Sequence, residues 1–324
     1  MLSISFIIPL YNGQNYIKRC IKSILSLRGI SGELIIINDG STDKSLEIVN
    51  LAIIAYNKHN FNIIIENQPN SGVAAARNRG IALATKEFLS VVDQDDFLLP
   101  NFVSVFDKQD FSEYDMIIGG YCRKNKSNTT TKKFVPTNAE FAKYCLTYPW
   151  GRLIRRQFLL TNHISFLKTG IGEDIYFNLV AYSYTNRIKM IQDYAYVWYI
   201  NEQSVSNTEY VYINSKTDSI QTFDAILQDI SKDFCDQKRY VEYYFIKYIV
   251  WFLLSNAKKS DYKMLINERN RLFTWLKLHY PDYQHNPSLN PLRPKGDSFV
   301  NKISVSIYFL LYKLHIDWVL LKLL

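Results

Sequence analysis

The first 92 residues alternate short apolar runs with segments of helical periodicity. The runs are rich in Ile, Val and Leu, which is typical of buried strands, and they occupy residues 3–9, 33–38, 62–66 and 87–92. Between them, apolar residues recur every three or four positions, which indicates helices. Strands that alternate with helices form a parallel sheet with right-handed crossovers. The pattern therefore predicts an α/β fold with a mostly parallel central sheet flanked by helices.

Three carboxylates follow the fourth predicted strand within four residues: Asp93, Asp95 and Asp96. Pro100 prevents the strand from continuing, so they should lie at the carboxyl end of the sheet, where open α/β sheets bind ligands. Like charges this close repel one another unless a cation is present. Mn²⁺ or Mg²⁺, shared with the phosphates of a substrate, is the natural occupant. The alternative is an acidic turn without a ligand, and the spacing alone favours neither.

Two other loops should meet the acidic turn at the same edge of the sheet. Tyr11 and Asn12 follow the first predicted strand, and Asp39 and Gly40 follow the second. The loops after parallel strands share one edge, and their meeting point is the usual nucleotide site of such a sheet. Asp39 could instead serve only as a turn and cap residue.

The overall charge and the cysteines restrict the class of partner. The net charge is +8, which suits a phosphate-bearing ligand or an anionic membrane surface. No basic helix or zinc-finger spacing is visible, so no nucleic acid partner is expected. The 4 cysteines are isolated and form no C-x-x-C pair, which fits a reducing compartment and argues against a zinc or redox site. No apolar stretch is long enough to predict a transmembrane helix.

The pattern changes along the rest of the chain. Residues 116–121 and 190–199 resemble strands, and the polar segment 124–133 is predicted to be a loop. From about residue 210 the periodicity is helical, and the many aromatics there are expected to form core. We therefore expect two regions, 1–210 and 211–324. The last segment, 303–324, is apolar but interrupted by charges; an interfacial membrane helix and a final core or homodimer helix are both open.

Five motifs occur in one order: Ile7-Ile-Pro-Leu-Tyr-Asn12, Asn38-Asp-Gly-Ser-Thr-Asp43, Ala76-Arg-Asn-Arg-Gly80, Asp93-Gln-Asp-Asp96 and Gly172-Glu-Asp174. In this order the chain resembles an inverting nucleotide-sugar glycosyltransferase of the large bacterial family 2, which has the GT-A fold. Each motif alone is weak, and the five together are specific. The resemblance covers roughly residues 1 to 210, as judged by these motifs. It does not reach the C-terminal third.

The resemblance implies roles for twelve residues. Those similar to nucleotide contacts are Pro9, Tyr11, Asp39, Ser41, Arg77 and Asp93. Asp95 resembles the metal ligand, and Asp174 resembles the catalytic base. Those similar to residues near the sugar or the acceptor are Asp96, Trp150, Arg152 and Glu173.

Several of these residues have a plainer explanation. Trp150 could be core, Arg77 a solvated helix residue, and the pair at 173–174 a favourable helix N-terminus. Relatives often carry an arginine where Tyr199 stands, so the second cation for the diphosphate is open among Arg152, Arg155 and Arg187.

The resemblance implies a UDP-sugar donor, with a galactose-type sugar favoured by the Asp-x-Asp-Asp form. The acceptor would be a glycan or lipid-linked glycan in bacterial surface polysaccharide or lipooligosaccharide synthesis. The expected location is the cytoplasm, with peripheral contact at the inner face of the cell membrane as a further expectation. A non-catalytic sugar-nucleotide-binding protein is the alternative. A sugar nucleotidyltransferase is less expected, because Pro9-Leu-Tyr-Asn-Gly13 is not a Gly-rich, basic phosphate loop.

Overall fold

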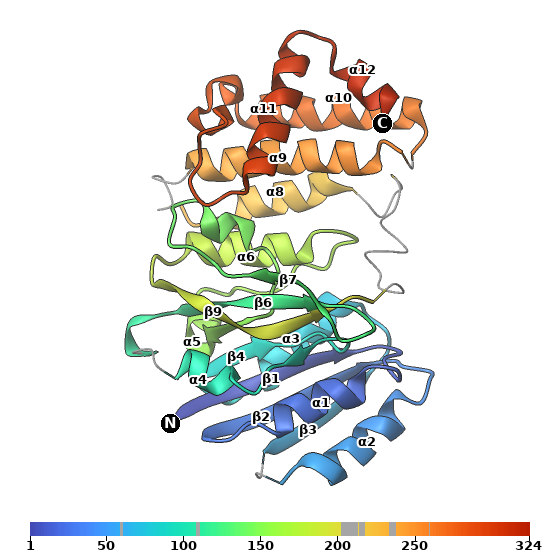
Figure 1. The fold of residues 1–324 in the computed structure, drawn as a ribbon, viewed down its shortest axis with the longest axis vertical. Coiled ribbons are helices and arrows are strands. Elements are labelled where there is room, and N and C mark those ends of the chain that lie inside the picture. The colour runs from blue at the N-terminus through green and yellow to red at the C-terminus, as the bar shows by residue number, and fades with distance from the viewer. Residues whose placement is uncertain (59–60, 108–110, 202–212, 214–217, 233–237, 259) are drawn as a thin grey trace. The chain divides into compact units, whose positions relative to one another are not determined.

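The computed structural model describes residues 1–58, 61–107, 111–201, 213, 218–232, 238–258 and 260–324. The chain forms two compact units (Figure 1). The first comprises residues 1–137, 148–168 and 184–201, and the second comprises residues 138–147, 169–183 and 202–324. The segments are thus interleaved, and whether folding domains divide near residue 210 stays a prediction.

The first half of the sheet is parallel, as the alternating pattern predicts. Its strands lie in the order β3 (Asn62–Gln68), β2 (Ile30–Asp39), β1 (Leu2–Leu10) and β4 (Phe88–Val91). Ile7 of β1 pairs with Ile35 of β2 and with Val91 of β4. The strands are apolar on both sides because helices cover both faces of a parallel sheet.

Three helices connect these strands: α1 (Ile17–Leu25), α2 (Ser45–Tyr56) and α3 (Val73–Leu83). Helices α1 and α2 pack together, whereas α3 packs against β1 and β2. Strand order reverses after β3, so a right-handed crossover places α3 on the opposite face. Gly80 permits close packing there, because a Cβ on it would lie 2.3 Å from Cγ2 of Ile7.

The second half of the sheet is mixed. The order continues from β4 through β8 (Arg152–Arg155), β6 (Met116–Lys124), β9 (Ile188–Tyr199) and β5 (Phe97–Leu98), and β7 (Thr130–Phe134) pairs with β6. Strands β6 and β9 pair in parallel, whereas β8 pairs antiparallel with β4 and β6, and β5 pairs antiparallel with β9. The smaller helices of this unit are α4 (Phe102–Phe106), η1 (Phe111–Glu113) and α5 (Arg156–Thr161).

The predicted loop at 124–133 is wrong in its last part, because β7 begins at Thr130 and pairs antiparallel with β6. Its residues from Thr130 to Lys133 are exposed. A strand with exposed polar side chains has no apolar alternation, so the sequence carries no period-2 signal for it. Phe134 ends the strand and stacks on Tyr121, with ring centroids 5.3 Å apart.

The second unit is helical. Its helices are η2 (Ala142–Cys145), α6 (Glu173–Ser183), α8 (Ser219–Asp229), α9 (Lys238–Asn256), α10 (Tyr262–His279), η5 (Tyr283–His285), η6 (Pro287–Leu289), α11 (Phe299–Lys313) and α12 (Asp317–Leu323). Helices α9 and α10 pack together, and α11 lies across α9 (Figure 1). Aromatics of α9 such as Tyr243, Phe245 and Tyr248 are buried, which confirms the predicted core. Trp251 is an exception, with 57% of its surface exposed.

The C-terminal segment is two helices and not the continuous one that its apolar pattern suggests. The chain turns at His315, whose φ is 58°, before α12 begins. Asp317 is fully buried and accepts hydrogen bonds from Nε and Nη2 of Arg269 at 2.8 and 2.6 Å. The Asp317 carboxylate is therefore buried in an ion pair and does not face solvent. In the described ranges, no helix combines the length and apolar character needed to cross a bilayer.

Candidate active site

The loops after β1 and β2 are joined at the carboxyl end of the parallel strands. The Asn12 amide donates to Oγ of Ser41 at 3.1 Å, and the Thr42 amide donates to Oδ1 of Asn12 at 2.9 Å. The Gly13 amide donates to Oγ of Ser45 at 2.8 Å. Asn12 adopts a positive φ of 47°, which asparagine tolerates better than most residues. Ser41 thus holds the first loop in place within this structure.

Gln94 connects the acidic turn to the first loop. Its Oε1 accepts from the Tyr11 amide and its Nε2 donates to the Tyr11 carbonyl, both at 2.9 Å. The Tyr11 side chain is exposed, whereas Pro9 is buried in β1 opposite Ile37. Sequence reasoning missed Gln94, because only its position between aspartates marks it.

Asp39 fixes the turn before α3. Its Oδ1 accepts from Nε2 of Gln68 at 2.7 Å and from the Ser71 amide at 2.8 Å. Its Oδ2 accepts from the Gly72 amide at 2.9 Å. These contacts are those of the turn and cap alternative. A contact with a nucleobase would have to use the remaining acceptor capacity of Oδ2.

Asp93 forms an ion pair with Arg77 of α3. The distance from Nη2 of Arg77 to Oδ1 of Asp93 is 3.0 Å, and the arginine side chain is almost fully buried. Arg77 is therefore not a solvated helix residue, and the alternative for it is wrong. Because α3 covers the face of the sheet opposite α1 and α2, this ion pair brings one cation to the acidic turn from the α3 face.

Asp95 is held by two residues that sequence reasoning missed. Its Oδ2 accepts from Nδ2 of Asn201 at 2.8 Å, and its backbone carbonyl accepts from Nη2 of Arg19 at 2.7 Å. Burial, reinforced by the charge of Asp93, raises the pKa of the Asp95 carboxyl.

The guanidinium of Arg19 lies over the rings of Tyr199 and Phe97, at 3.8 and 4.5 Å from their centroids. Tyr199 stands at the position expected to hold an arginine, and its ring instead packs against Arg19 of α1. Two of the predicted substitutes are engaged elsewhere. Arg155 pairs with Glu87, at the opposite end of β4, and Arg187 donates to the carbonyls of η1.

Asp96 is buried and directed toward β9. Its Oδ2 accepts from Oη of Tyr196 at 2.6 Å and its Oδ1 accepts from the Tyr199 amide at 2.8 Å. Burial, and then the charges of Asp95 and Asp93, raise the pKa of this carboxyl well above its ordinary value. The contacts anchor the acidic turn to the mixed half of the sheet. The role near a donor sugar stays a prediction for Asp96.

Trp150 belongs to an aromatic cluster. It stacks on Tyr148 and Tyr196 with centroids 4.0 and 4.5 Å apart, and it meets Tyr121 edge-on at 5.1 Å. Arg152 is also buried, with its guanidinium 5.3 Å from the Tyr148 ring. These positions are those of core residues, as the alternative for Trp150 expects. Through Tyr196 the cluster supports Asp96.

Glu173 and Asp174 begin α6 in the second unit. Gly172 precedes them with a φ of 84°, a conformation that favours glycine. The Asp174 carbonyl accepts from Nδ2 of the buried Asn178 at 2.8 Å, and the same amide donates to the Thr147 carbonyl at 2.9 Å. Both acidic side chains are half-buried. Two carboxylates in a first helical turn are stabilised by the helix dipole, and this placement leaves catalysis by Asp174 a prediction.

The carboxylates fit a divalent cation that is shared with a ligand. Within the described part of the chain, no three His, Cys, Asp or Glu side chains are grouped to hold a metal alone. Mg²⁺ and Mn²⁺ commonly bind through one or two carboxylates while substrate phosphates supply the rest. The half-buried Asp95, with the carboxylate of Asp93 two residues before it in the same turn, provides such a position.

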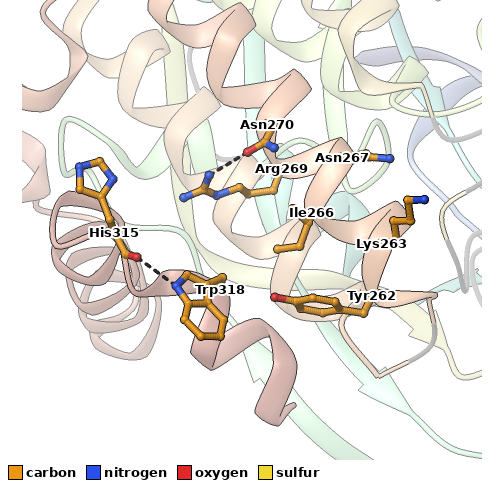
Figure 2. Close-up of a pocket in the computed structure, with 8 residues that line it drawn as sticks. All are labelled: Tyr262, Lys263, Ile266, Asn267, Arg269, Asn270, His315 and Trp318. Carbon is orange, nitrogen blue, oxygen red and sulfur yellow. Dashed lines mark hydrogen bonds between the residues drawn. The ribbon is translucent and has the colours of Figure 1, made fainter.

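A separate hollow of about 450 Å³ lies in the second unit (Figure 2). Helix α10 supplies one side, including Tyr262 and Asn267, and His315 and Trp318 supply the other. Trp318 is held by a hydrogen bond from its indole nitrogen to the His315 carbonyl at 3.1 Å. None of the predicted site residues lines this hollow.

Known proteins of one class resemble this chain in sequence. The model of glycosyl transferase family 2 matches residues 5–169. Glycosyltransferase GlyA of Streptococcus pneumoniae serotype 4 is 27% identical over 224 residues, which are 63% of this chain and 31% of that protein. The uncharacterized glycosyltransferase EpsJ of Bacillus subtilis is 28% identical over 227 residues, which are 64% of this chain and 64% of that protein. The match thus covers less than two thirds of each relative's length.

Solved structures share the fold. Residues 1–349 of S. aureus TarS in complex with UDP-GlcNAc superpose with a TM-score of 0.73 at 18% identity, over 97% of this chain and 92% of that one. The mannosyltransferase PcManGT from Pyrobaculum calidifontis, in complex with GDP-Man and Mn²⁺, gives a TM-score of 0.57 at 13% identity, over 97% of this chain and 88% of that one.

The sheet, its helices and this likeness define an α/β protein with the GT-A type of fold. The family match identifies it further: the chain belongs to glycosyl transferase family 2. The predicted family and fold are therefore confirmed, and the family makes the predicted enzyme class that of a transferase.

Proposed function

We propose that this protein transfers a sugar from a UDP-sugar to a hydroxyl of a glycan acceptor. One observation carries the proposal: in a member of family 2, the turn with Asp93 and Asp95 lies at the carboxyl end of β4 and is bonded through Gln94 to the loop after β1. That edge is where α/β sheets of this kind bind nucleotides. TarS, which shares the fold, was solved with UDP-GlcNAc, and this supports a nucleotide-sugar donor.

In this proposal the base lies against the loops after β1 and β2. Tyr11 has an exposed ring that can stack on uracil, and Asp39 keeps acceptor capacity for its N–H. Pro9 and Ser41 shape these loops. Arg77 and Arg19 place two cations at the acidic turn, where they would stabilise the negative charge of the diphosphate.

Asp95 would hold Mn²⁺ or Mg²⁺, with Asp93 nearby. When bound, the cation would act as a Lewis acid toward the leaving diphosphate. PcManGT, a structure with the same type of fold, contains Mn²⁺, which supports a metal here. Asp96 positions the turn through Tyr196, so its contribution to the sugar site would act through the aspartates beside it.

Asp174 would take the proton from the acceptor hydroxyl as a general base. Attack from the face opposite the diphosphate would invert the anomeric centre, so an α-linked donor would give a β-linked product. Glu173, beside it, would bind the acceptor. Trp150 and Arg152 would support the sugar site through their contacts in the aromatic cluster, with Tyr196 and Tyr148 respectively.

The resemblance favours a galactose-type sugar. The acceptor class we propose is a lipid-linked or growing glycan of a bacterial surface polysaccharide or lipooligosaccharide. With such an acceptor, the enzyme would act in the cytoplasm, at the inner face of the membrane.

The test is UDP release by the Asp174→Asn variant with a panel of UDP-sugars and glycan acceptors. We expect turnover to fall by about two to four orders of magnitude, as for loss of a general base, while UDP-sugar binding is kept. Glu173→Gln removes the neighbouring charge from the same helical turn; as a variant of an acceptor contact it should raise the KM for the acceptor and keep kcat, whereas Asp174→Asn should lower kcat itself. Unchanged turnover in Asp174→Asn would exclude it as the base. No UDP release from the wild type with any donor would favour a binding protein.

A further inference from the structure

Helix α11 has two apolar faces, and only one of them is packed. Val305, Tyr308 and Phe309 are buried, on a helix that packs against α9 and η6. Another set of apolar side chains on the same helix and its C-cap is exposed, by 64%, 72%, 52%, 57% and 58% in order. We call this set the outer stripe: Phe299, Val300, Ile307, Leu310 and Leu314.

The outer stripe lies on one face of the helix. At about 100° per residue, its five side chains fall within an arc of roughly 100°, and the arc runs the whole length of the helix. The buried side chains lie on the opposite side of the same projection. Exposed apolar surface gathered in this way, unlike scattered apolar residues, marks an interaction site.

Within residues 286–324, the segment that contains the outer stripe, the exposed charged side chains are all basic. Residues 286–324 contain five lysines and arginines, of which Arg293, Lys295, Lys313 and Lys322 are exposed and Lys302 is partly exposed. The segment has only two acidic residues, and both point inward. The Asp297 side chain is 1% exposed and pairs with Lys247 at 2.8 Å. Asp317 is paired with Arg269.

Two of these lysines border the stripe. Lys302 and Lys313 fall on the same edge of it in the helical projection, between the buried and the exposed face. The Lys313 ammonium donates to the Gln284 carbonyl at 3.0 Å, so Lys302 is the one of the two whose alkyl chain can lie along the apolar surface while its ammonium group reaches a polar layer. Apolar side chains flanked by basic ones, with the acids withdrawn, are the pattern of a helix that lies in a membrane interface.

We propose that the outer stripe of α11 docks on the surface of an anionic phospholipid bilayer, with the helix lying in the interface and not crossing it. A second copy of the chain fits less well. In a two-fold dimer the same surface meets itself, so the exposed cations of residues 286–324 would face a copy of the same segment, in which both acidic side chains are already paired inward. This inference does not depend on the donor or on the catalytic residues.

The test is co-sedimentation of the full chain with vesicles of phosphatidylcholine, with and without phosphatidylglycerol. We expect binding to the anionic vesicles that weakens as salt is added. The double variant Ile307→Glu/Leu310→Glu should bind at least about tenfold more weakly, because it places two charges in the apolar layer. Arg293→Gln/Lys295→Gln should lower binding to anionic vesicles by roughly tenfold, without altering the apolar stripe.

The matched control is Leu51→Glu/Ile54→Glu on α2, two side chains with the same spacing and exposures of 60% and 83%. It should bind vesicles as the wild type does. Equal binding by the Ile307→Glu/Leu310→Glu variant would overturn the proposal, as would no binding by the wild type. A wild-type dimer in sedimentation velocity that this variant dissociates, without any vesicle binding, would show that a second copy covers the stripe instead.

Discussion

Glu33 shows how a buried carboxylate stabilises the parallel sheet. Its Oε2 accepts from Oγ of Ser5 at 2.6 Å and from the Thr85 amide at 3.0 Å, and its Oε1 accepts from Nδ2 of Asn62 at 3.0 Å and from Oγ1 of Thr85 at 2.9 Å. Burial works to raise the pKa of this carboxyl, but the hydrogen bonds from Ser5 and Thr85 outweigh it and lower the pKa below its ordinary value of 4.5.

We predict that Glu33→Gln lowers the free energy of unfolding at pH 7 by about 1.5–3 kcal/mol, the range for hydrogen bonds to a charged group. Because the folded pKa lies below the unfolded one, the carboxylate contributes its full stability above the unfolded value and loses it as pH falls through the folded pKa. Urea denaturation from neutral to acid pH should therefore show the difference between variant and wild type shrinking. Glu47→Gln, an exposed glutamate, should change little at any pH. A pH-independent difference would contradict the account.

The sequence places the aspartates of the candidate site but not their partners. An apolar run that ends before Asp93, followed by Pro100, is enough to locate the turn at the end of a strand. Gln94 bonds to a loop 83 residues earlier, and Asn201 reaches Asp95 across 106 residues. Such pairs depend on tertiary packing, and neither residue type has a local pattern that indicates it.

Elements with a buried face were predictable, and those without one were not. Each run from β1 to β4 was found because apolar side chains mark both faces of the strand. The sequence does not indicate strand β7, because its side chains are polar and only its backbone pairing with β6 makes it a strand. The division of the C-terminal segment into α11 and α12 was missed for another reason: a buried ion pair at Asp317 looks in sequence like a solvated charge.

At the level of elements, the contact between α3 and β1 depends on Gly80. Alanine there would gain about 1 kcal/mol in helix propensity, but its Cβ would clash with Cγ2 of Ile7 at 2.3 Å. We predict that Gly80→Ala is destabilising overall by roughly 1–2 kcal/mol, as overpacked cores are. In urea denaturation, the double variant Gly80→Ala/Ile7→Ala should cost less than the sum of its single changes. A higher free energy of unfolding for Gly80→Ala would contradict the account, because it would show that α3 and β1 can accommodate a methyl group at residue 80.

Helices α12 and α10 are joined by the ion pair between Asp317 and Arg269. Asp317→Ala leaves Arg269 without its buried partner, and loss of one member of such a pair typically costs about 3–5 kcal/mol. We expect the lower end of that range, because the Arg269 side chain keeps 19% exposure. Thermal unfolding is the measurement, with Lys322→Gln in the same helix as the control. Equal melting temperatures for Asp317→Ala and the control would mean that the pair is not structural.

For the whole molecule, the family and the fold followed from five motifs in one order, whereas the substrate did not. Donor and acceptor choice depends on a few pocket contacts, and no motif specifies them. The central claim is narrower: the edge formed by Asp39, Asp93 and Asp95 binds UDP together with a divalent cation. It can be tested before any sugar is known.

The measurement is a thermal-shift titration of the wild type and Asp95→Asn with UDP, GDP or CDP, each with Mn²⁺ or with EDTA. A ligand that binds only the folded protein raises the melting temperature, by the equivalent of about 2.7 kcal/mol at a hundred times its Kd. We predict that UDP gives this shift only with Mn²⁺, and that Asp95→Asn loses most of it. A shift with GDP or CDP alone would contradict the donor. The same UDP shift in Asp95→Asn, or no shift with any nucleotide, would contradict the site.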